Sequence, residues 1–235
     1  MAGLRSGPAL AGWMLYLLLP SPAAAQQTIF NVPSGDVLKK GEVYVELDVP
    51  LRPQESRFVS FVPRLVVGVG RRVEVGLNFT GNIQPGTDTT TLAPTFKWKL
   101  YDGKENGWSF VVGDTLQIPV RNRAYDVGNY AYVQCFKTFR RGTRIGFGAY
   151  DFTARVVAPG GNRAGGQFTF EHPVHPKLTL AADWYTGNHA SGYASLGAIA
   201  KPHPRVTLYT AYSVGNSGVR NGNHFFLIEL GYTLK

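Results

Sequence analysis

The sequence predicts an all-β protein, a single up-and-down antiparallel transmembrane β-barrel of about twelve strands. The first observation is a repeat: KLTLAADWYTGN at 177–188 returns as RVTLYTAYSVGN at 205–216, and each copy follows a His-Pro pair. The second is alternation of apolar and polar residues in most segments after residue 40, which is the period of a strand with two different faces. The third is composition, because aromatic residues reach 13% and 28 of the 235 residues are glycine, as is typical of transmembrane barrels.

The repeat gives the size of the building unit. The two copies start 28 residues apart, and a further alternating stretch, Tyr193–Ala200, lies between them. About 14 residues therefore make one strand with its turn, and 28 make one hairpin. A shorter third copy, RVEVGLNFTGN, lies at 72–82. Consecutive hairpins of this length predict a row of antiparallel strands in sequence order.

The first 25 residues have the pattern of a secretory signal peptide. Arg5 precedes the apolar run Leu10–Leu19, and three alanines follow at 23–25. The run is too short for an ordinary membrane-spanning helix, so we expect cleavage after residue 25 and export of the remainder. An uncleaved anchor is the alternative. The predicted division is a cleaved signal peptide at 1–25, a periplasmic N-terminal lead at 26–40 and an outer-membrane β-barrel at 41–235.

The N-terminal lead is expected to be short and local in structure. Ser34 is placed to cap a single helical turn that runs through Lys39, because serine is a favoured residue at a helix N-cap.

Charge and cysteine content limit the partners of the exported chain. The formal net charge is +9 and becomes +8 when Arg5 leaves with the signal peptide. The basic residues are scattered rather than striped, so we expect no nucleic acid partner and favour acidic lipopolysaccharide head groups. The only cysteine, Cys135, excludes an internal disulfide framework.

Period-2 alternation divides the chain into twelve expected strands. Short stretches rich in glycine, asparagine and proline separate them. The expected strands lie near 41–50, 57–69, 71–81, 91–101, 107–119, 129–139, 143–156, 165–172, 177–186, 192–201, 205–214 and 223–234.

The alternation also predicts which face of each strand meets lipid. Between residues 42 and 49, Val43, Val45 and Leu47 alternate with polar or aromatic neighbours. A lysine or arginine at mid-membrane on the lipid face costs about 2–4 kcal/mol, so charged strand residues are expected in the lumen. The predicted pore-lining residues are Glu42, Glu46, Asp48, Arg64, Arg72, Glu74, Lys97, Lys99, Lys137, Glu171, Asp183, Lys201 and Glu229.

Two acidic residues break the pattern, because Asp114 and Asp151 fall with the apolar set of their strands. A β-bulge that shifts the register or a position near the membrane edge would each account for them.

The connections between strands alternate in length. Longer ones such as IQPGTDTT and VRNRAYDVG follow the odd-numbered strands, and tight turns such as Gly70 or the His-Pro pairs follow most even-numbered ones. Long loops at one end and short turns at the other are typical of outer-membrane barrels. With twelve strands, both ends of the barrel then lie on the short-turn side, which is the periplasmic side.

At this level the chain resembles the porin-like outer-membrane β-barrel proteins of diderm bacteria. The resemblance covers 41–235 and is architectural, and the lead-in NVPSGDVLKKGEVYVELD is similar to that of small barrels of this class. It implies an outer-membrane location, with outer-membrane lipids and the barrel-assembly machinery as partners, and says nothing of the oligomeric state. The ending Tyr232-Thr233-Leu234-Lys235 departs from the terminal aromatic residue that such barrels usually carry.

One pair of residues could support catalysis. Outer-membrane phospholipase A and the lipid A deacylase use a histidine and a serine two residues apart on one strand, and this chain has His189 and Ser191. Here a glycine follows the serine and the pair falls in a loop, so we predict no enzyme and no catalytic residue. No H-x-x-x-H or C-x-x-C pattern occurs, so no metal site or cofactor is predicted either.

The sequence therefore favours a narrow passive channel for small polar or charged solutes. The near balance of acids and bases among the pore-lining residues predicts ion pairs across the lumen, which keep such a channel narrow. A structural or surface-interaction barrel with an occluded lumen is the alternative, because small barrels are commonly filled by side chains. An outer-membrane lipid hydrolase that uses His189 and Ser191 is a remote alternative.

Overall fold

The computed structural model describes residues 27–54, 57–80, 90–121, 126–216 and 224–234. Almost all regular structure in these ranges is β-strand, with one short 3-10 helix, η1, at Ala154–Val156. None of the helical structure in these ranges has the length and apolar character needed to cross a membrane. The strands are β1 (Val43–Arg52), β2 (Phe58–Val59), β3 (Val62–Gly70), β4 (Val73–Thr80), β5 (Thr91–Gly103), β6 (Trp108–Pro119), β7 (Gly128–Thr138), β8 (Arg144–Phe152), β9 (Ala164–His175), β10 (Leu178–Tyr185), β11 (Tyr193–His203), β12 (Val206–Gly215) and β13 (His224–Thr233).

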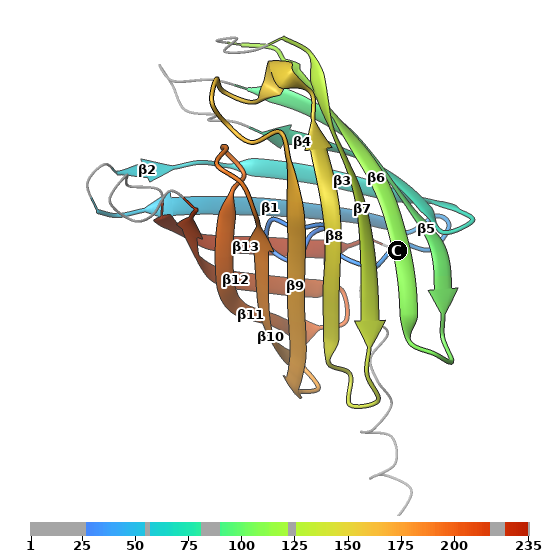
Figure 1. Cartoon of the computed structure of the whole chain (residues 1–235). Helices are drawn as coiled ribbons and strands as arrows, with labels where there is room; N and C mark the ends of the chain where they lie inside the picture. Colours follow the sequence, from blue (N-terminus) through green and yellow to red (C-terminus); the bar gives the residue numbers. More distant parts are fainter. Residues whose placement is uncertain (1–26, 55–56, 81–89, 122–125, 217–223, 235) are drawn as a thin grey trace, which may run out of the picture.

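The strands form one closed antiparallel barrel (Figure 1). From β3 to β13 each strand pairs with the next in sequence, and β1 pairs with both β3 and β13. The β1–β13 ladder runs from Tyr44 opposite Thr233 to Leu51 opposite Phe226 and closes the ring. The two-residue β2 pairs only with the end of β1. The prediction of an up-and-down barrel of twelve strands is confirmed, with β2 as one extra strand.

Two expected strands end differently from the prediction. The segment at 57–69 divides into β2 and β3, although both pair with β1 in one register and Ser60 between them donates its backbone N–H to the Pro50 carbonyl. The segment at 143–156 ends at Phe152, where the chain enters η1 and Val156 donates to the Thr153 carbonyl.

The two ends of the barrel have different connections, as the sequence predicted. Turns of a few residues join β3 to β4, β9 to β10 and β11 to β12, whereas long connections such as 153–163 lie at the other end. Gly142, in the β7–β8 turn, has a φ of 82°, a left-handed conformation that glycine adopts without steric penalty. The end with long connections is called the loop end below, and the other the turn end.

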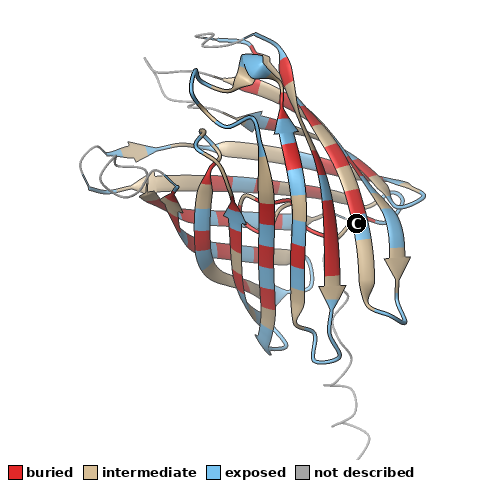
Figure 2. Ribbon diagram, viewed as in Figure 1, coloured by how far each residue is buried: buried red, intermediate tan, exposed pale blue. Residues whose placement is uncertain are grey.

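The outer surface of the barrel is apolar. Along β13, Phe226, Ile228 and Leu230 are exposed, while Phe225, Leu227 and Glu229 between them are buried, and Figure 2 shows the same alternation on neighbouring strands. A contiguous apolar belt around a closed barrel would be costly in water and is favourable in lipid. The exposed face is therefore the membrane-facing surface.

Asp114 and Asp151 both face outward. The ladders of β6 with β7 and of β7 with β8 have no register shift, so a bulge is the wrong explanation for these residues. On the outer face the Asp114 carboxylate accepts a hydrogen bond of 2.7 Å from the Asn129 side chain, whereas Asp151 is exposed. A position near the membrane edge remains the prediction for both.

The expectation for the lead at 26–40 was wrong in its local structure. No helical turn forms after Ser34, because Asp36–Lys39 lie in irregular backbone. The segment 27–40 instead lies inside the ring of strands (Figure 1), where Ile29, Phe30 and Val32 are at most 1% exposed. We call residues 27–40 the plug segment. Its backbone lies close to Gly68, where an added Cβ would be 2.0 Å from the Lys39 carbonyl oxygen.

The assignment of the exposed strand face to lipid can be tested by placing arginine at two different depths in the membrane. Ile228→Arg, at the centre of β13, should lower the free energy of unfolding in a lipid bilayer by about 2–4 kcal/mol, because arginine is then buried in lipid. Leu234→Arg, on the same face just beyond the strand, should cost about 1 kcal/mol or less. Equal losses in a denaturant titration of both variants would contradict the assignment.

Candidate functional site

The lumen is the candidate functional site, and the plug segment occupies its middle. Phe30 and Ile29 belong to an apolar cluster with the inward-facing residues Ile199, Phe225 and Leu227. The plug forms a small hairpin in which Ile29 donates its N–H to the Val32 carbonyl. Apolar packing of this kind removes side chains from water and favours the inserted arrangement.

One carboxylate holds the tip of this hairpin. Asp183 Oδ2, on β10, accepts hydrogen bonds from the backbone N–H groups of Phe30 (3.0 Å), Asn31 (2.6 Å) and Val32 (2.8 Å). Successive N–H groups that converge in this way form an anion-binding concavity. The Asn31 side chain also donates to Ser195 Oγ at 2.9 Å. Bonds to an ionised acceptor are stronger than neutral ones, so Asp183 is the main polar anchor of the plug.

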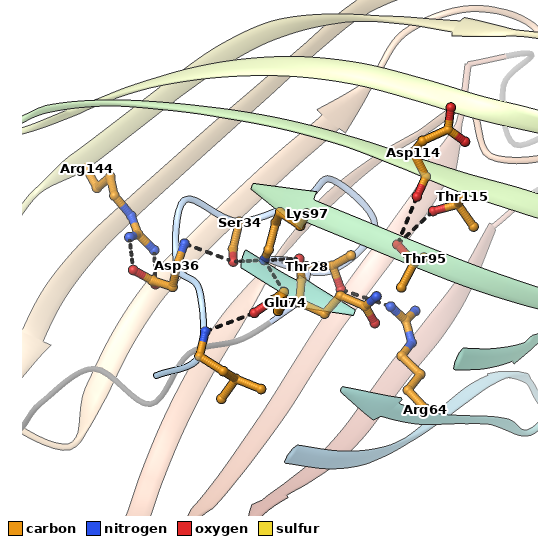
Figure 3. Close-up of polar contacts among 12 residues, drawn as sticks. Thr28, Ser34, Asp36, Arg64, Glu74, Thr95, Lys97, Asp114, Thr115 and Arg144 are labelled. Carbon is orange, nitrogen blue, oxygen red and sulfur yellow. Dashed lines mark hydrogen bonds and ion pairs between the residues drawn. The ribbon is translucent and has the colours of Figure 1, made fainter. Parts of the chain in front are cut away.

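A buried ion pair supports the base of the hairpin (Figure 3). Lys97 Nζ on β5 lies 2.9 Å from Glu74 Oε1 on β4, and both side chains are at most 3% exposed. The ammonium also donates to the Gln27 carbonyl at 3.3 Å and to Ser34 Oγ at 3.4 Å. Glu74 accepts the Leu38 N–H at 2.9 Å. The pair therefore joins the barrel wall to both sides of the plug.

Arg144 forms a second ionic anchor near the turn end. Its guanidinium makes paired bonds to Asp36 in the plug, at 2.9 and 2.8 Å, and to Glu171 on β9, at 2.7 and 2.9 Å. Burial alone would raise the pKa of Asp36, but the charge of Arg144 and its hydrogen bonds outweigh burial and lower the pKa below its usual value. The pairing with Arg144 therefore favours the ionised form of Asp36.

A third charged group lies at the closing strands. Arg64 on β3 lies 2.5 Å from Asp48 and 3.6 Å from Glu46, both on β1, and donates at 3.3 Å to Thr28 Oγ1 of the plug. The Tyr44 hydroxyl donates to Glu46 at 2.5 Å. Each interior anchor thus combines residues of the wall with a group of the plug.

Most of the predicted pore-lining residues lie in the interior. Lys99 and Lys201 are half-buried and within electrostatic reach of Asp36. The others in the interior are buried or, for Arg64, nearly so: Glu46, Asp48, Arg64, Glu74, Lys97, Glu171, Asp183 and Glu229.

Three of the predicted pore-lining residues are elsewhere. Arg72 is exposed in the β3–β4 turn, and Glu42 lies at the turn-end rim, 3.8 Å from Lys39. Lys137 is on the outer face, where its Nζ donates to the Asn106 carbonyl at 2.5 Å and lies 5.0 Å from the Trp108 ring centre.

The sequence predicted Lys137 in the lumen because its apolar neighbour, Phe136, was expected to face lipid, but Phe136 faces inward. Phe136 is fully buried, and its ring lies where a Cβ added to Gly35 of the plug would approach to 3.0 Å. The rule that apolar strand residues face lipid fails wherever the plug provides an apolar surface inside the barrel.

A large cavity lies above the plug, toward the loop end. Its volume is about 830 Å³, and Gln27, Thr28 and Asn31 of the plug line it. One wall carries aromatic residues such as Tyr130 and Tyr185. The opposite wall is mostly hydroxyl, amide and guanidinium groups, among them Arg52, Arg64, Asn78, Thr80, Thr95, Thr115, Gln117 and Arg121. We call this cavity the vestibule.

His189 and Ser191 line the vestibule but are not arranged as a base and a nucleophile. His189 Nε2 contacts the Tyr150 hydroxyl at 2.8 Å and the Thr186 carbonyl at 2.9 Å, and Nδ1 accepts the backbone N–H of Ser191 at 3.2 Å. Both ring nitrogens are therefore used by structural contacts. Burial lowers the pKa of His189, so the ring is neutral at pH 7.

Sequence reasoning missed Asp36 and Arg144. Asp36 was assigned to a lead outside the barrel, and Arg144 is the first residue of its strand, next to a turn. No spacing in the sequence relates two residues that the fold brings together from such distant positions.

The barrel is similar to solved outer-membrane proteins, although no protein-family model and no curated protein matches the chain. A KdgM porin in complex with disordered oligogalacturonate aligns with a TM-score of 0.58 at 6% identity, over 83% of this chain and 99% of that one. A COG4313 outer membrane channel from Pseudomonas putida F1 aligns at 0.44, with 14% identity over 84% and 96%. Outer membrane phospholipase A from Escherichia coli aligns at 0.47, with 13% identity over 85% and 94%.

At these identities the likeness concerns the fold alone. The TM-score of 0.58 to the KdgM porin agrees with the closed barrel described above. The chain has the fold of porin-like outer-membrane barrels, and the outer membrane is its location.

The anchoring role of Asp183 can be tested by labelling. Ile29→Cys, in a chain whose Cys135 is replaced by serine, should react slowly with a water-soluble maleimide because residue 29 is fully buried. Adding Asp183→Ala removes the acceptor of three N–H groups and should raise the labelling rate at least about tenfold, which corresponds to about 1.4 kcal/mol.

The matched control for this experiment is Asp151→Ala, which removes an exposed carboxylate from the outer face. It should leave the rate unchanged. Equal rates in the Asp183 and Asp151 variants would show that the plug is held by other contacts.

Proposed function

We propose that the protein is a narrow passive channel of the outer membrane for small polar or charged solutes, and that the plug segment sets the width of its lumen. The observation that carries the proposal is the vestibule, which has hydroxyl, amide and guanidinium groups on one wall and the plug as its floor. Solutes would enter at the loop end, pass beside the plug hairpin and leave at the turn end.

The composition of the lumen supports permeation by hydrophilic solutes. The buried wall positions around the plug include Gln134, Gln167, Ser195, Thr207 and Ser213 in addition to the charged anchors. A barrel that serves only as a scaffold would gain more stability from apolar packing than from paired buried charges. Hydroxyl and amide groups along a path replace part of the hydration shell of a passing solute.

The plug supports a channel that is narrow rather than wide. A twelve-stranded barrel has a backbone radius of roughly 12–13 Å, and the side chains of the wall do not fill that space alone. Contacts of the plug with Asp183, Lys97 and Arg144 hold it across the middle of this space. The remaining path is limited by how far the hairpin moves against these anchors.

The vestibule lining favours anions. Among the described residues that line it are Arg52 and Arg121, and no aspartate or glutamate. Arg64 also lines it, but its charge is paired with Asp48 and Glu46. Rings of basic side chains at a channel mouth raise the local concentration of anions. Outer-membrane lipids with lipopolysaccharide remain proposed partners of the outer surface, and the barrel-assembly machinery a proposed partner during insertion.

The second candidate function is an occluded barrel that acts through its surface. The plug contacts support this candidate, because a plug that stays bound to Asp183, Lys97 and Arg144 would block the lumen to solutes. Conductance therefore separates the two functions directly.

The channel function is tested in planar lipid bilayers with refolded protein. The wild type should show a small, defined conductance, and Asp183→Ala should increase it at least about twofold because the freed hairpin widens the path. Asp151→Ala, on the outer face, is the control and should conduct like the wild type. Absence of conductance in all three across a wide voltage range would exclude the channel and leave the occluded barrel.

The ion preference is tested separately by reversal potentials in a potassium chloride gradient. The wild type should prefer chloride, and Arg52→Gln, which removes a positive charge from the vestibule, should reduce this preference. Arg205→Gln removes the same charge from an exposed turn at the other end and should have little effect. An unchanged preference in both variants would place the selective region away from the vestibule.

A further inference from the structure

A group of acidic side chains lies where the barrel closes. Asp48 on β1 and Glu229 on β13 are directly opposite in the closing ladder, and Glu46 is on the same face of β1. Their carboxylate oxygens lie within 4.8 Å of one another, and the residues are 3%, 1% and 4% exposed. Like charges directly opposite each other on neighbouring strands destabilise a sheet, so this arrangement needs a compensating cation.

The cations of the described structure do not provide full compensation. Arg64 lies 2.5 Å from Asp48 and 3.6 Å from Glu46, so three carboxylates share one guanidinium. When all three are ionised, two negative charges remain. Other interior carboxylates have clear partners: Lys97 for Glu74 and Arg144 for Glu171.

Glu229 is the exception among the described interior carboxylates. Both of its oxygens are buried and neither accepts a hydrogen bond within the described part of the chain. Its side chain points at Asp48 and Glu46, which lie beside it in the ladder. An ionised carboxylate buried without a partner costs several kcal/mol. The orientation of Glu229 toward two further acids is therefore the mark of a ligand position rather than of a structural contact.

We infer that Glu46, Asp48 and Glu229 bind one divalent cation of the hard type that prefers carboxylate oxygens, such as Ca²⁺. Two positive charges neutralise the surplus that Arg64 leaves. Oxygens bound to one Ca²⁺ at about 2.3–2.6 Å can be at most about 5.2 Å apart. One carboxylate oxygen from each residue lies within 4.8 Å of the other two, so the three can share one such ion.

The position gives the ion a structural role and a route. It would join β1 to β13 through their side chains, at the ladder that closes the barrel. Arg64, which contacts two of the ligands, also lines the vestibule, so the vestibule would be the route of an ion from the loop end. No sequence motif predicts the site, because its ligands come from strands that are neighbours in the barrel but lie near opposite ends of the sequence.

Calcium binding is tested on protein refolded in zwitterionic detergent, which offers no competing lipid phosphate. Equilibrium dialysis with radioactive Ca²⁺ at pH 7 should give one ion per chain. Glu229→Gln should weaken binding at least about tenfold, because ligand charge sets the affinity of such sites. Glu171→Gln makes the same change in the separate Arg144 cluster and should bind like the wild type. Terbium luminescence excited through Tyr44, whose hydroxyl contacts Glu46, gives a second readout.

Thermal unfolding separates this site from simple protonation of the cluster. The wild type should unfold at a higher temperature in Ca²⁺ than with a chelator, and Glu229→Gln should unfold at the same temperature in both. The groups that face the cluster are Arg64, Tyr44, Tyr209 and Asp183, so protons are the competing ligand. A wild type that binds no Ca²⁺ at millimolar concentration, or equal binding by the Glu229 and Glu171 variants, would overturn the inference.

Discussion

A closed barrel of twelve strands encloses more space than its own side chains fill, and the rest of the structure follows from how that space is occupied. About eight strands make an interior that side chains just fill. Here the plug segment supplies the missing volume, with Phe30 and Ile29 packed against inward-facing apolar residues. Asp183 and the Lys97–Glu74 pair then satisfy backbone groups that the plug brings away from water, and Arg144 pairs with the Asp36 side chain.

This arrangement explains why charged residues are buried in the wall. Buried ion pairs are rarely more stable than apolar packing, but removing one partner is strongly destabilising. Lys97 and Arg144 each contact both the wall and the plug. Displacing the plug would leave the wall acids with fewer partners, so the charges make the inserted position specific. Glu229 is unusual by comparison, because neither of its carboxylate oxygens accepts a hydrogen bond from the described residues of the wall or the plug.

The fold was largely predictable because barrel strands obey a short local rule. Alternation with period 2 located the strands, and the lengths of the connections gave the two ends of the barrel. The facing of β13, for example, follows from Ile228 and its neighbours alone. Local rules fail where a distant segment changes the surroundings of a strand, as at Phe136 and Lys137.

The candidate site was predictable only in part. Alternation placed Asp183 and Glu74 inside the barrel, but it could not say that one holds three N–H groups of the plug and the other pairs with Lys97. The segment 27–40 has no period of its own, and its position depends on contacts with residues far away in sequence, such as the hydrogen bond between Asn31 and Ser195, 164 positions apart. Such contacts exist only once the barrel has closed.

The most direct test of the account is hydrogen exchange of the plug amides in the refolded barrel. The N–H groups of Phe30, Asn31 and Val32 should exchange as slowly as strand amides, because each donates to the buried Asp183 carboxylate. Amides of the loop-end connection at 158–163 give the fast reference within the same sample. Exchange of the three plug amides at the rate of that connection would show that the segment does not occupy the lumen, and the account of the interior would fail.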